Sequence, residues 1–192
     1  MSRPTVPIFR DKSDLVALPK IPESMHASFV AMGNRLNGGG LSYFDKLRAV
    51  YEFMDLYGAW VASFAVCTRG CSHCCRMDVR VGSLEAHYIQ ENAPVKVDGL
   101  GWSVTAGHRT ACPFLGSDNT CTVYEFRPFN CRTFHTLDDP KYCEDGDESH
   151  QVYGSAGAGY GVGFYSTLAA WLERIEETHE GRFRDIRDWF PG

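Results

Sequence analysis

The chain has 192 residues, of which 44% are hydrophobic, so it is long enough to bury a core of its own. Its formal net charge is −5 and no basic run exceeds two residues, which argues against binding to nucleic-acid backbones. No run of roughly 18 apolar residues occurs, and the N-terminal residues lack an apolar signal core. The sequence therefore predicts a soluble, cytoplasmic protein that does not cross a membrane.

The first 22 residues contain four prolines and little periodicity. This pattern is typical of an extended arm that wraps the domain or a partner, and a disordered tail is the alternative. We therefore expect an extended N-terminal arm over residues 1–22. The rest of the chain, 23–192, is expected to form a single cysteine-cluster metal-binding domain.

Two amphipathic helices are predicted before the first cysteine. Met25, Phe29, Met32 and Leu36 share one helical face, which predicts a helix over about 24–36 with these side chains in the core. A glycine triplet ends it. Ser42, three residues before an aspartate, is typical of the start of a second helix over about 42–64.

Eight cysteines carry the main chemical signal, and four of them fall within nine residues. A disulfide framework is disfavoured, because no signal peptide is present and the core is too large to need cross-links. Thiolates are ligands of both zinc and iron–sulfur clusters, so the sequence predicts a metal site. The predicted ligands are Cys67, Cys71, Cys74, Cys75, Cys112, Cys121, Cys131 and Cys143.

The region around and between the cysteines has weaker patterns. Residues 77–81 alternate as in a short strand, and Ser83 is a candidate N-cap for a helix over about 83–92 that ends before Pro94. Residues 95–105 resemble a hairpin around Asp98-Gly99, and residues 121–124 a short strand. Adjacent Cys74 and Cys75 are expected to point in different directions.

The C-terminal part is predicted to close the fold. Residues 154–163 are rich in glycine but lack the lysine and flanking strand of a phosphate-binding loop, so a connector is favoured. An amphipathic helix is expected over about 164–179, followed by a short helix with Ile186, Trp189 and Phe190. The predicted fold class is mainly α, with an irregular, cysteine-rich metal-binding core and minor β hairpins.

Three cysteine motifs together resemble a known family. They are C-x3-C-x2-C-C from Cys67, C-P-F-L from Cys112, and C-T-V-Y-E-x-R-P-x-x-C-R from Cys121 to Arg132. The combination is similar to the YkgJ-type cysteine-cluster family, described as a zinc- or iron-chelating domain with a CxxCxxCC signature. The resemblance covers about a third of the chain. It departs from the signature in the first spacing, three residues instead of two, and Cys143 lies outside it.

The resemblance implies a bound metal and does not specify a reaction. Members are often labelled iron–sulfur proteins or oxidoreductases, and the seven motif cysteines are expected to face one another. His73 is an alternative ligand or only a neighbour of the site. Arg127 and Arg132 either offset thiolate charge or form ordinary ion pairs. The acidic stretch is expected to be a solvated loop, with a hard-cation site as the alternative; its members are Asp138, Asp139, Glu144, Asp145, Asp147 and Glu148.

Two functions remain from the sequence. The first is a metal-binding protein that holds an iron–sulfur cluster in a redox or group-transfer role. The alternative is a structural Zn²⁺ protein that acts as an interaction or assembly subunit, with a protein partner bound through the N-terminal arm or the aromatic C-terminus. The sequence leaves open whether the protein is an enzyme.

Overall fold

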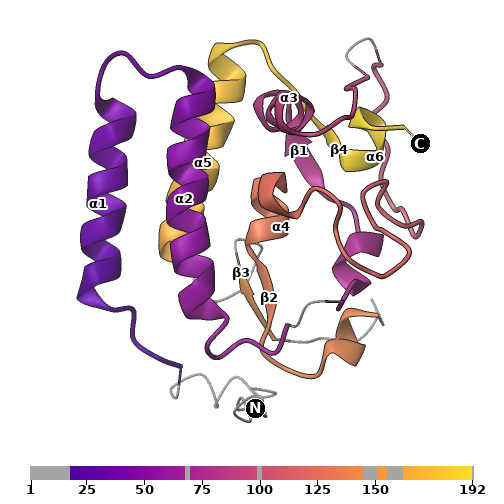
Figure 1. Ribbon diagram of the computed structural model, residues 1–192, viewed down its shortest axis with the longest axis horizontal. Coiled ribbons are helices and arrows are strands. Elements are labelled where there is room, and N and C mark those ends of the chain that lie inside the picture. Colours follow the sequence, from indigo (N-terminus) through magenta and orange to yellow (C-terminus); the bar gives the residue numbers. More distant parts are fainter. Residues whose placement is uncertain (1–17, 68–69, 99–100, 145–150, 155–161, 192) are drawn as a thin grey trace. The chain divides into compact units, whose positions relative to one another are not determined.

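The computed structural model describes residues 18–67, 70–98, 101–144, 151–154 and 162–191. The chain divides into two compact units, each described by itself here. Unit 1 comprises Met1–Thr68 and Thr133–Tyr165, and unit 2 comprises Arg69–Arg132 and Ser166–Gly192. The described part is mainly helical with small strands and a cysteine-rich region of irregular backbone, which confirms the predicted fold class (Figure 1). The predicted N-terminal arm lies largely outside the described residues.

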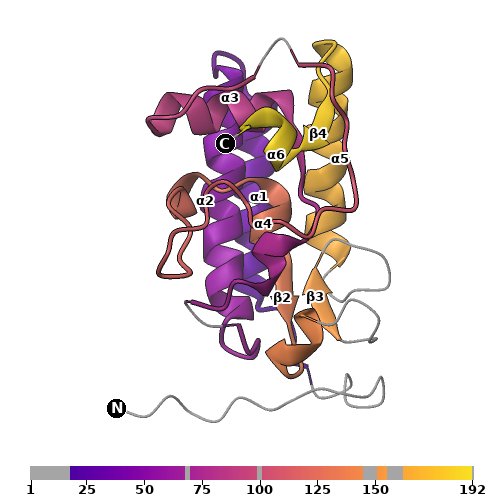
Figure 2. The ribbon, with the colours of Figure 1, turned by 90° about the vertical axis from the view of Figure 1, so that its right-hand side faces the viewer.

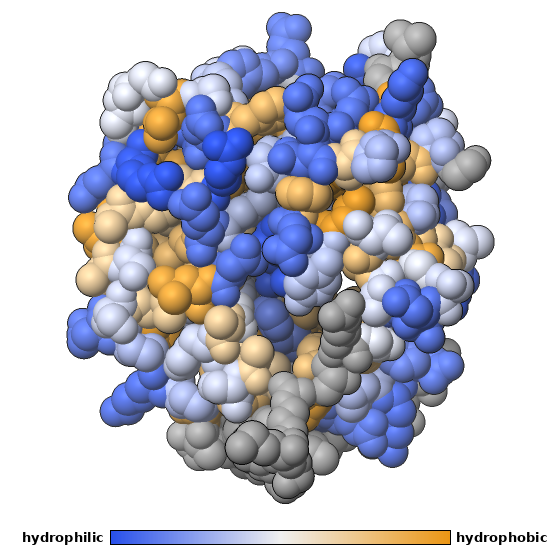
Figure 3. All heavy atoms as spheres, in the orientation of Figure 1, coloured by the Kyte–Doolittle hydropathy of each residue, from blue (hydrophilic) through white to orange (hydrophobic). Residues whose placement is uncertain are grey.

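Unit 1 is built on two long helices, α1 (Glu23–Asn37) and α2 (Tyr43–Val61), which lie side by side (Figure 1). The apolar stripe predicted for α1 is confirmed, with Met25, Met32 and Leu36 buried. The predicted cap of α2 is confirmed as well, because the Ser42 hydroxyl accepts a hydrogen bond from the Asp45 N–H. On the outer surface of this helix pair, apolar patches alternate with polar side chains (Figure 3).

An aromatic cluster joins α2 to the second part of unit 1. The Tyr57 hydroxyl, buried on α2, is hydrogen-bonded to the hydroxyl of Tyr153 on β3 (Val152–Gly154). β3 pairs antiparallel with β2 (Phe134–Thr136), and the two strands are seen side by side in Figure 2. Both hydroxyl pKa values rise, mainly because burial disfavours the phenolate. These contacts place β2 beside the end of α2.

Unit 2 has its own hydrophobic core around a second two-stranded sheet. β1 (Arg80–Gly82) pairs antiparallel with β4 (Phe183–Asp185), which leads into the short helix α6 (Ile186–Trp189). α3 (Ser83–Asn92) follows β1 directly, and α4 (Phe129–Arg132) lies beside β1. The predicted terminal helix is therefore confirmed. The core residues are Val79, Val81, Ala86, Ile89, Phe114, Val123, Ile186, Trp189 and Phe190.

The remaining helix, α5 (Val162–Thr178), contributes its first turn to unit 1 and the rest to unit 2. It confirms the helix predicted over about 164–179. In unit 1, the Phe164 ring packs on Phe29 and Phe53 with ring centroids 4.5 and 5.4 Å apart, respectively. No helix of the described residues is long and apolar enough to cross a membrane.

The strands differ from the predicted hairpins. Both sheets pair segments that are distant in sequence, and the described residues of 95–105 contain no strand. The Asp98 N–H donates instead to the Trp189 carbonyl oxygen, and Arg184 donates to the Asp98 carbonyl oxygen. Residues 121–124 form an isolated bridge and a turn rather than a strand. Long-range partners therefore satisfy the backbone groups that a local hairpin would have used.

The acidic stretch also differs from its prediction where it is described. Asp138 in unit 1 is buried rather than solvated. Its carboxylate accepts hydrogen bonds from the Thr136 hydroxyl and the Gln151 N–H, at 3.0 and 2.8 Å. Asp139 caps the 3₁₀ turn η4 (Pro140–Cys143) by accepting from the Lys141 N–H. Residues 145–150 lie outside the described part of the chain.

A glycine on β1 makes room for a buried carboxylate. A Cβ added at Gly82 would collide with Oε1 of Glu176, which the Leu84 N–H holds at 2.8 Å. We expect Gly82→Ala to lower the free energy of unfolding by about 1–3 kcal/mol, measured by urea denaturation. Gly33→Ala in α1 is the matched control, because no heavy atom lies within 4 Å of its added Cβ. That substitution should raise stability by about 0.5–1 kcal/mol. Equal effects of the two would contradict the packing at Glu176.

Candidate metal centre

The first cysteine segment reaches unit 2 through a tight 3₁₀ turn, η2 (His73–Arg76), which carries Cys74 and Cys75. The Cys75 N–H donates to the Ser72 carbonyl oxygen at 3.0 Å. The two adjacent thiols are hydrogen-bonded to each other. Successive residues of a 3₁₀ turn lie a third of a turn apart, and whether the two thiols serve different metals or opposite sides of a cluster remains a prediction.

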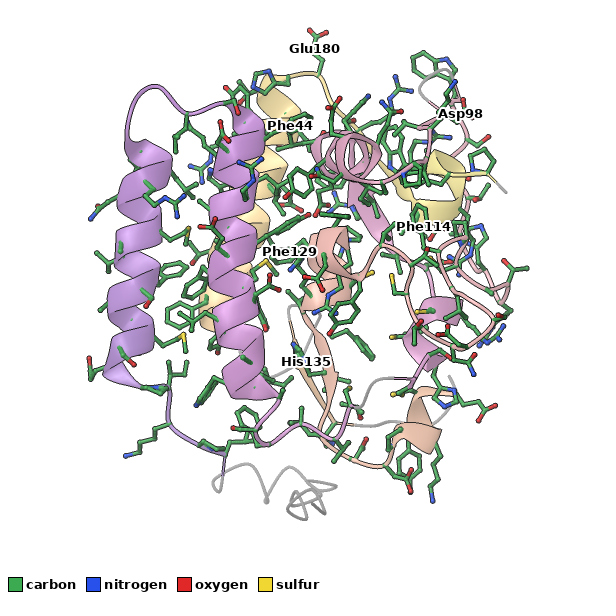
Figure 4. The ribbon with its side chains drawn as sticks, in the orientation of Figure 1. Phe44, Asp98, Phe114, Phe129, His135 and Glu180 are labelled. Carbon is green, nitrogen blue, oxygen red and sulfur yellow. The ribbon has the colours of Figure 1, made fainter. Side chains whose placement is uncertain are left out.

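The second cysteine segment is a compact loop closed by local hydrogen bonds. Leu115 and Cys121 form an isolated β-bridge, and Asn119 has a φ of 60°, in the left-handed region that asparagine tolerates. Cys131 lies on the short helix α4, where its N–H donates to the Pro128 carbonyl oxygen. Phe114, labelled in Figure 4, anchors the loop on the core by packing its ring 4.8 Å from that of Phe190.

The two segments meet at one backbone hydrogen bond. The Cys112 N–H donates to the Cys75 carbonyl oxygen at 2.7 Å. Cys112, Cys121 and Cys131 all pack against the hydrophobic core of unit 2. All eight cysteines of the chain are free thiols and each is partly buried. Unit 2 thus places thiols from both segments on one apolar support.

Four thiols form an electrostatically coupled group, which we call the thiol group: Cys75, Cys112, Cys121 and Cys131. Burial and, to a smaller extent, the neighbouring thiolates of Cys75 and Cys121 raise the pKa of Cys112 to about 11. Burial also raises the pKa of Cys121 and Cys131, with added repulsion from other members of the group. Without a metal these three thiols stay protonated at neutral pH, whereas a coordinated thiol is deprotonated outright.

Cys75 is the exception within the thiol group. A hydrogen bond from Cys74 and the positive charges of Arg187 and Arg76 lower its pKa to about 7. In metal-free protein we therefore expect Cys75 to be half thiolate near pH 7, and the rate of its alkylation by iodoacetamide to rise through that pH. Mass spectrometry of the labelled peptides checks this. Cys131 should stay unlabelled until far more alkaline pH. Labelling of Cys75 that begins only above pH 8 would contradict the prediction.

The remaining predicted ligands fall in different places. Cys71 and Cys74 belong to unit 2, whereas Cys67 and Cys143 belong to unit 1. Within unit 1, the Thr136 N–H on β2 donates to the Cys67 sulfur at 3.2 Å. Cys143 ends η4. Metal ligation by these four residues remains a prediction.

The histidines have the following partners. His108 is hydrogen-bonded through both ring nitrogens, to Asp78 and to the Thr105 hydroxyl, at 2.7 and 2.8 Å. In unit 1, His135, labelled in Figure 4, is hydrogen-bonded to the Tyr165 hydroxyl. His73 lies on η2 beside the adjacent cysteines. Because His73 lies on this turn, it remains the histidine predicted as an alternative to a thiol ligand.

Of the two arginines predicted to offset thiolate charge, Arg127 acts electrostatically on two thiols of the group. Its charge lowers the pKa of Cys121 and Cys131 against the effect of burial. Its guanidinium stacks 3.7 Å above the Tyr124 ring, and no contact between it and Glu125 is seen. The Arg132 guanidinium, almost fully buried, donates to the Glu125 and Arg127 carbonyl oxygens. Arg132 thus supports the loop that carries Arg127.

The sequence analysis missed Arg187 and the side chains that hold it. Arg187 on α6 donates to the Cys75 and Thr110 carbonyl oxygens, although it lies 112 residues beyond Cys75. Its charge lowers the pKa of Cys75 and of Cys112. Asp185 pairs with it at 3.0 Å. No spacing rule links these positions, since only the β1–β4 pairing brings α6 to the cysteines.

Asp185 also belongs to a group of metal-ligand type with Asp78 and His108, whose ligand atoms lie within 4.8 Å of one another. Every member is already engaged. Asp78 accepts from two backbone N–H groups as well as from His108, which lowers its pKa to about 2. Asp185 accepts from the Val79 N–H and from Arg187. These hydrogen bonds occupy the three side chains, and through Asp185 the group supports Arg187.

The residues of the site fit a thiolate-bound metal. Four thiols are coupled on one support, and two arginines whose Nε atoms are buried without a partner among the described residues, Arg127 and Arg187, act on them. Buried donors of this kind require an acceptor, which metal-bound sulfur provides. The chemistry of the donor set therefore agrees with zinc or iron.

The comparisons with known proteins agree with this conclusion. Residues 66–151 match the family model CxxCxxCC, a putative zinc- or iron-chelating domain. The matched region contains all eight cysteines. No curated protein and no solved structure matches the chain. Residues 66–151 of this chain are therefore similar to a zinc- or iron-chelating, cysteine-cluster domain, which agrees with metal binding.

Proposed function

We propose that the thiol group of unit 2 holds an iron–sulfur cluster, and that the protein uses it in a redox or group-transfer role. The observation that carries this proposal is that two cysteine segments meet in unit 2. The Cys112 N–H donates to the Cys75 carbonyl oxygen at 2.7 Å, and Cys112, Cys121 and Cys131 pack on one hydrophobic core. Thiolates of this kind are the usual ligands of such clusters. When bound, the cluster supplies one-electron chemistry or an iron that accepts a ligand.

The spacing of the sulfurs supports a cluster over a single zinc ion. Four sulfurs bound at about 2.3 Å to one tetrahedral zinc lie only about 3.8 Å apart. In the described part of unit 2, no three cysteine sulfurs lie within 4.8 Å of one another. A cluster tolerates wider spacing, because its thiolates bind different iron atoms.

The surroundings support a redox role. Cysteines 112, 121 and 131 pack on the apolar core, whose low polarity limits access of water. Burial and nearby charges are levers that set the reduction potential of an iron–sulfur cluster. The thiol group offers both, since it combines apolar packing with Arg127 and Arg187.

Purification without oxygen tests the proposal. We expect a brown protein with visible absorption, and iron and acid-labile sulfide in similar amounts per chain. Dithionite should bleach the absorption, and air should restore or destroy it. The control is the variant Cys131→Ser, which should be colourless. A colourless wild-type protein with stoichiometric zinc would refute the cluster.

One observation favours the alternative, a structural zinc ion in an interaction or assembly subunit. Between α3 and Arg132, the described residues contain only η3 (Tyr124–Phe126) and α4 as regular elements. Loops of this kind are commonly fixed by zinc. In the same stretch, Trp102 and Val104 are 82% and 73% exposed, as expected of a contact surface. The metal analysis above distinguishes the two functions.

A further inference from the structure

Arg187 joins the two cysteine segments through its guanidinium. Its Nη2 donates to the Cys75 carbonyl oxygen at 3.3 Å and to the Thr110 carbonyl oxygen at 2.7 Å, two residues before Cys112. Its Nη1 donates to the Met77 carbonyl oxygen and to Asp185. Only 11% of the side chain is exposed. The guanidinium is therefore fixed in position before any metal binds.

One N–H donor of the Arg187 guanidinium has no acceptor among the described residues. The Nε atom of Arg187 is buried and has no hydrogen-bond partner among the described residues. Leaving a buried charged donor unpaired costs about 1–3 kcal/mol or more, so each such atom calls for an explanation. The backbone contacts of Arg187 lie at Cys75 and close to Cys112 in sequence, and its charge acts on both of these thiols.

Arg127 shares this feature with Arg187. Its Nε is also buried without a partner among the described residues. Stacking on the Tyr124 ring and the two hydrogen bonds from Arg132 to the backbone fix its position. Its charge acts on Cys121 and Cys131. Each arginine thus serves a different pair of the four thiols.

We propose that Arg127 and Arg187 are positioning residues that donate their Nε–H groups to the sulfur ligands of the metal centre. The inference rests on the proposed metal site, and holds for iron or zinc. Four thiolates outweigh the charge of one divalent metal, and the two guanidinium groups offset the excess. Hydrogen bonds to the sulfurs also tune the potential of an iron–sulfur cluster.

Zinc affinity of the metal-free protein tests the proposal whichever metal is native, because the thiols bind both. Wild type, Arg127→Met and Arg187→Met are titrated with Zn²⁺ against a chromophoric chelator. We expect each substitution to weaken the affinity about 10–100-fold, as is usual when partners of metal ligands are lost. In the iron-loaded form, the reduction potential should move to more negative values, because a positive charge and a donor are removed.

The matched control is Arg80→Met. Arg80 also stacks on an aromatic ring, 3.5 Å from the centre of Phe183, and its ion pair with Glu173 is exposed. This variant should bind zinc like the wild type. Arg127→Lys and Arg187→Lys keep the charge without an Nε–H, so we expect them to restore only part of the affinity.

Results that would overturn this inference differ from those that would refute the proposed iron–sulfur cluster. Wild-type affinity in both methionine variants would overturn the inference, and so would full recovery in both lysine variants. Zinc rather than iron in anaerobically purified protein would refute the cluster but leave this comparison valid. Thermal unfolding of the metal-free variants detects loss of the fold. If Arg187→Met destabilises the chain, Arg127→Met decides, because its guanidinium joins no cysteine segments.

Discussion

Removing the metal is expected to release the cysteine loops of unit 2 while its core stays folded. Between α3 and the end of α4, regular structure is limited to short turns, so residues 101–132 depend on local hydrogen bonds rather than on a helix or sheet. Structural zinc contributes about 10–16 kcal/mol in small domains, and part of that stabilisation should be lost here. We expect trypsin to cleave after Arg109 and after Arg132 much faster after chelation, as measured by mass spectrometry of timed digests.

The long helices of unit 1 supply the internal control. Cleavage within α1 and α2 should keep its rate, because their buried residues pack with one another and with aromatic side chains of the same unit. Adding metal back should restore protection of residues 101–132. Identical digestion patterns with and without metal would contradict a structural contribution of the metal.

Replacing Cys131 by serine is expected to abolish metal binding by the thiol group. Cys131 lies on α4 and is coupled to Cys75, Cys112 and Cys121, so its loss breaks the group at its centre. A hydroxyl is a poor ligand for zinc or iron at neutral pH. We expect metal bound per chain to fall by the whole content of this site, as measured by elemental analysis after anaerobic purification.

Cys143→Ser is the comparison that fixes the number of metals. Cys143 belongs to unit 1 and lies outside the signature, although the family match covers this residue. A lower metal content in this variant would make Cys143 a ligand and favour two closed sites. Unchanged content would leave one site and exclude the model with two four-cysteine sites. Retention of full metal content in Cys131→Ser would overturn the assignment of the thiol group itself.

The helices were predictable because their signals are local. The stripe of Met25, Met32 and Leu36 and the cap at Ser42 depend on residues within one or two turns. The strands were predictable only in part: the alternation at residues 77–81 overlaps β1, but no local pattern indicated its partner β4. Asp98-Gly99 has the composition of a hairpin turn, but the Asp98 backbone is hydrogen-bonded to Trp189 and Arg184 at the other end of the chain. Contacts over such distances in sequence leave no periodic trace.

The candidate site, like the fold, was predictable only where its signals are local in sequence. The sequence by itself identified a cysteine-cluster region of zinc- or iron-chelating type, because thiol chemistry and motif spacing are properties of short segments. Only the tertiary structure showed that thiols of both segments lie on one core and that Arg187 contacts the Cys75 backbone. The physical reason is that the pairing of β1 with β4 brings α6 to the cysteine segments, and that pairing depends on burial of a shared core.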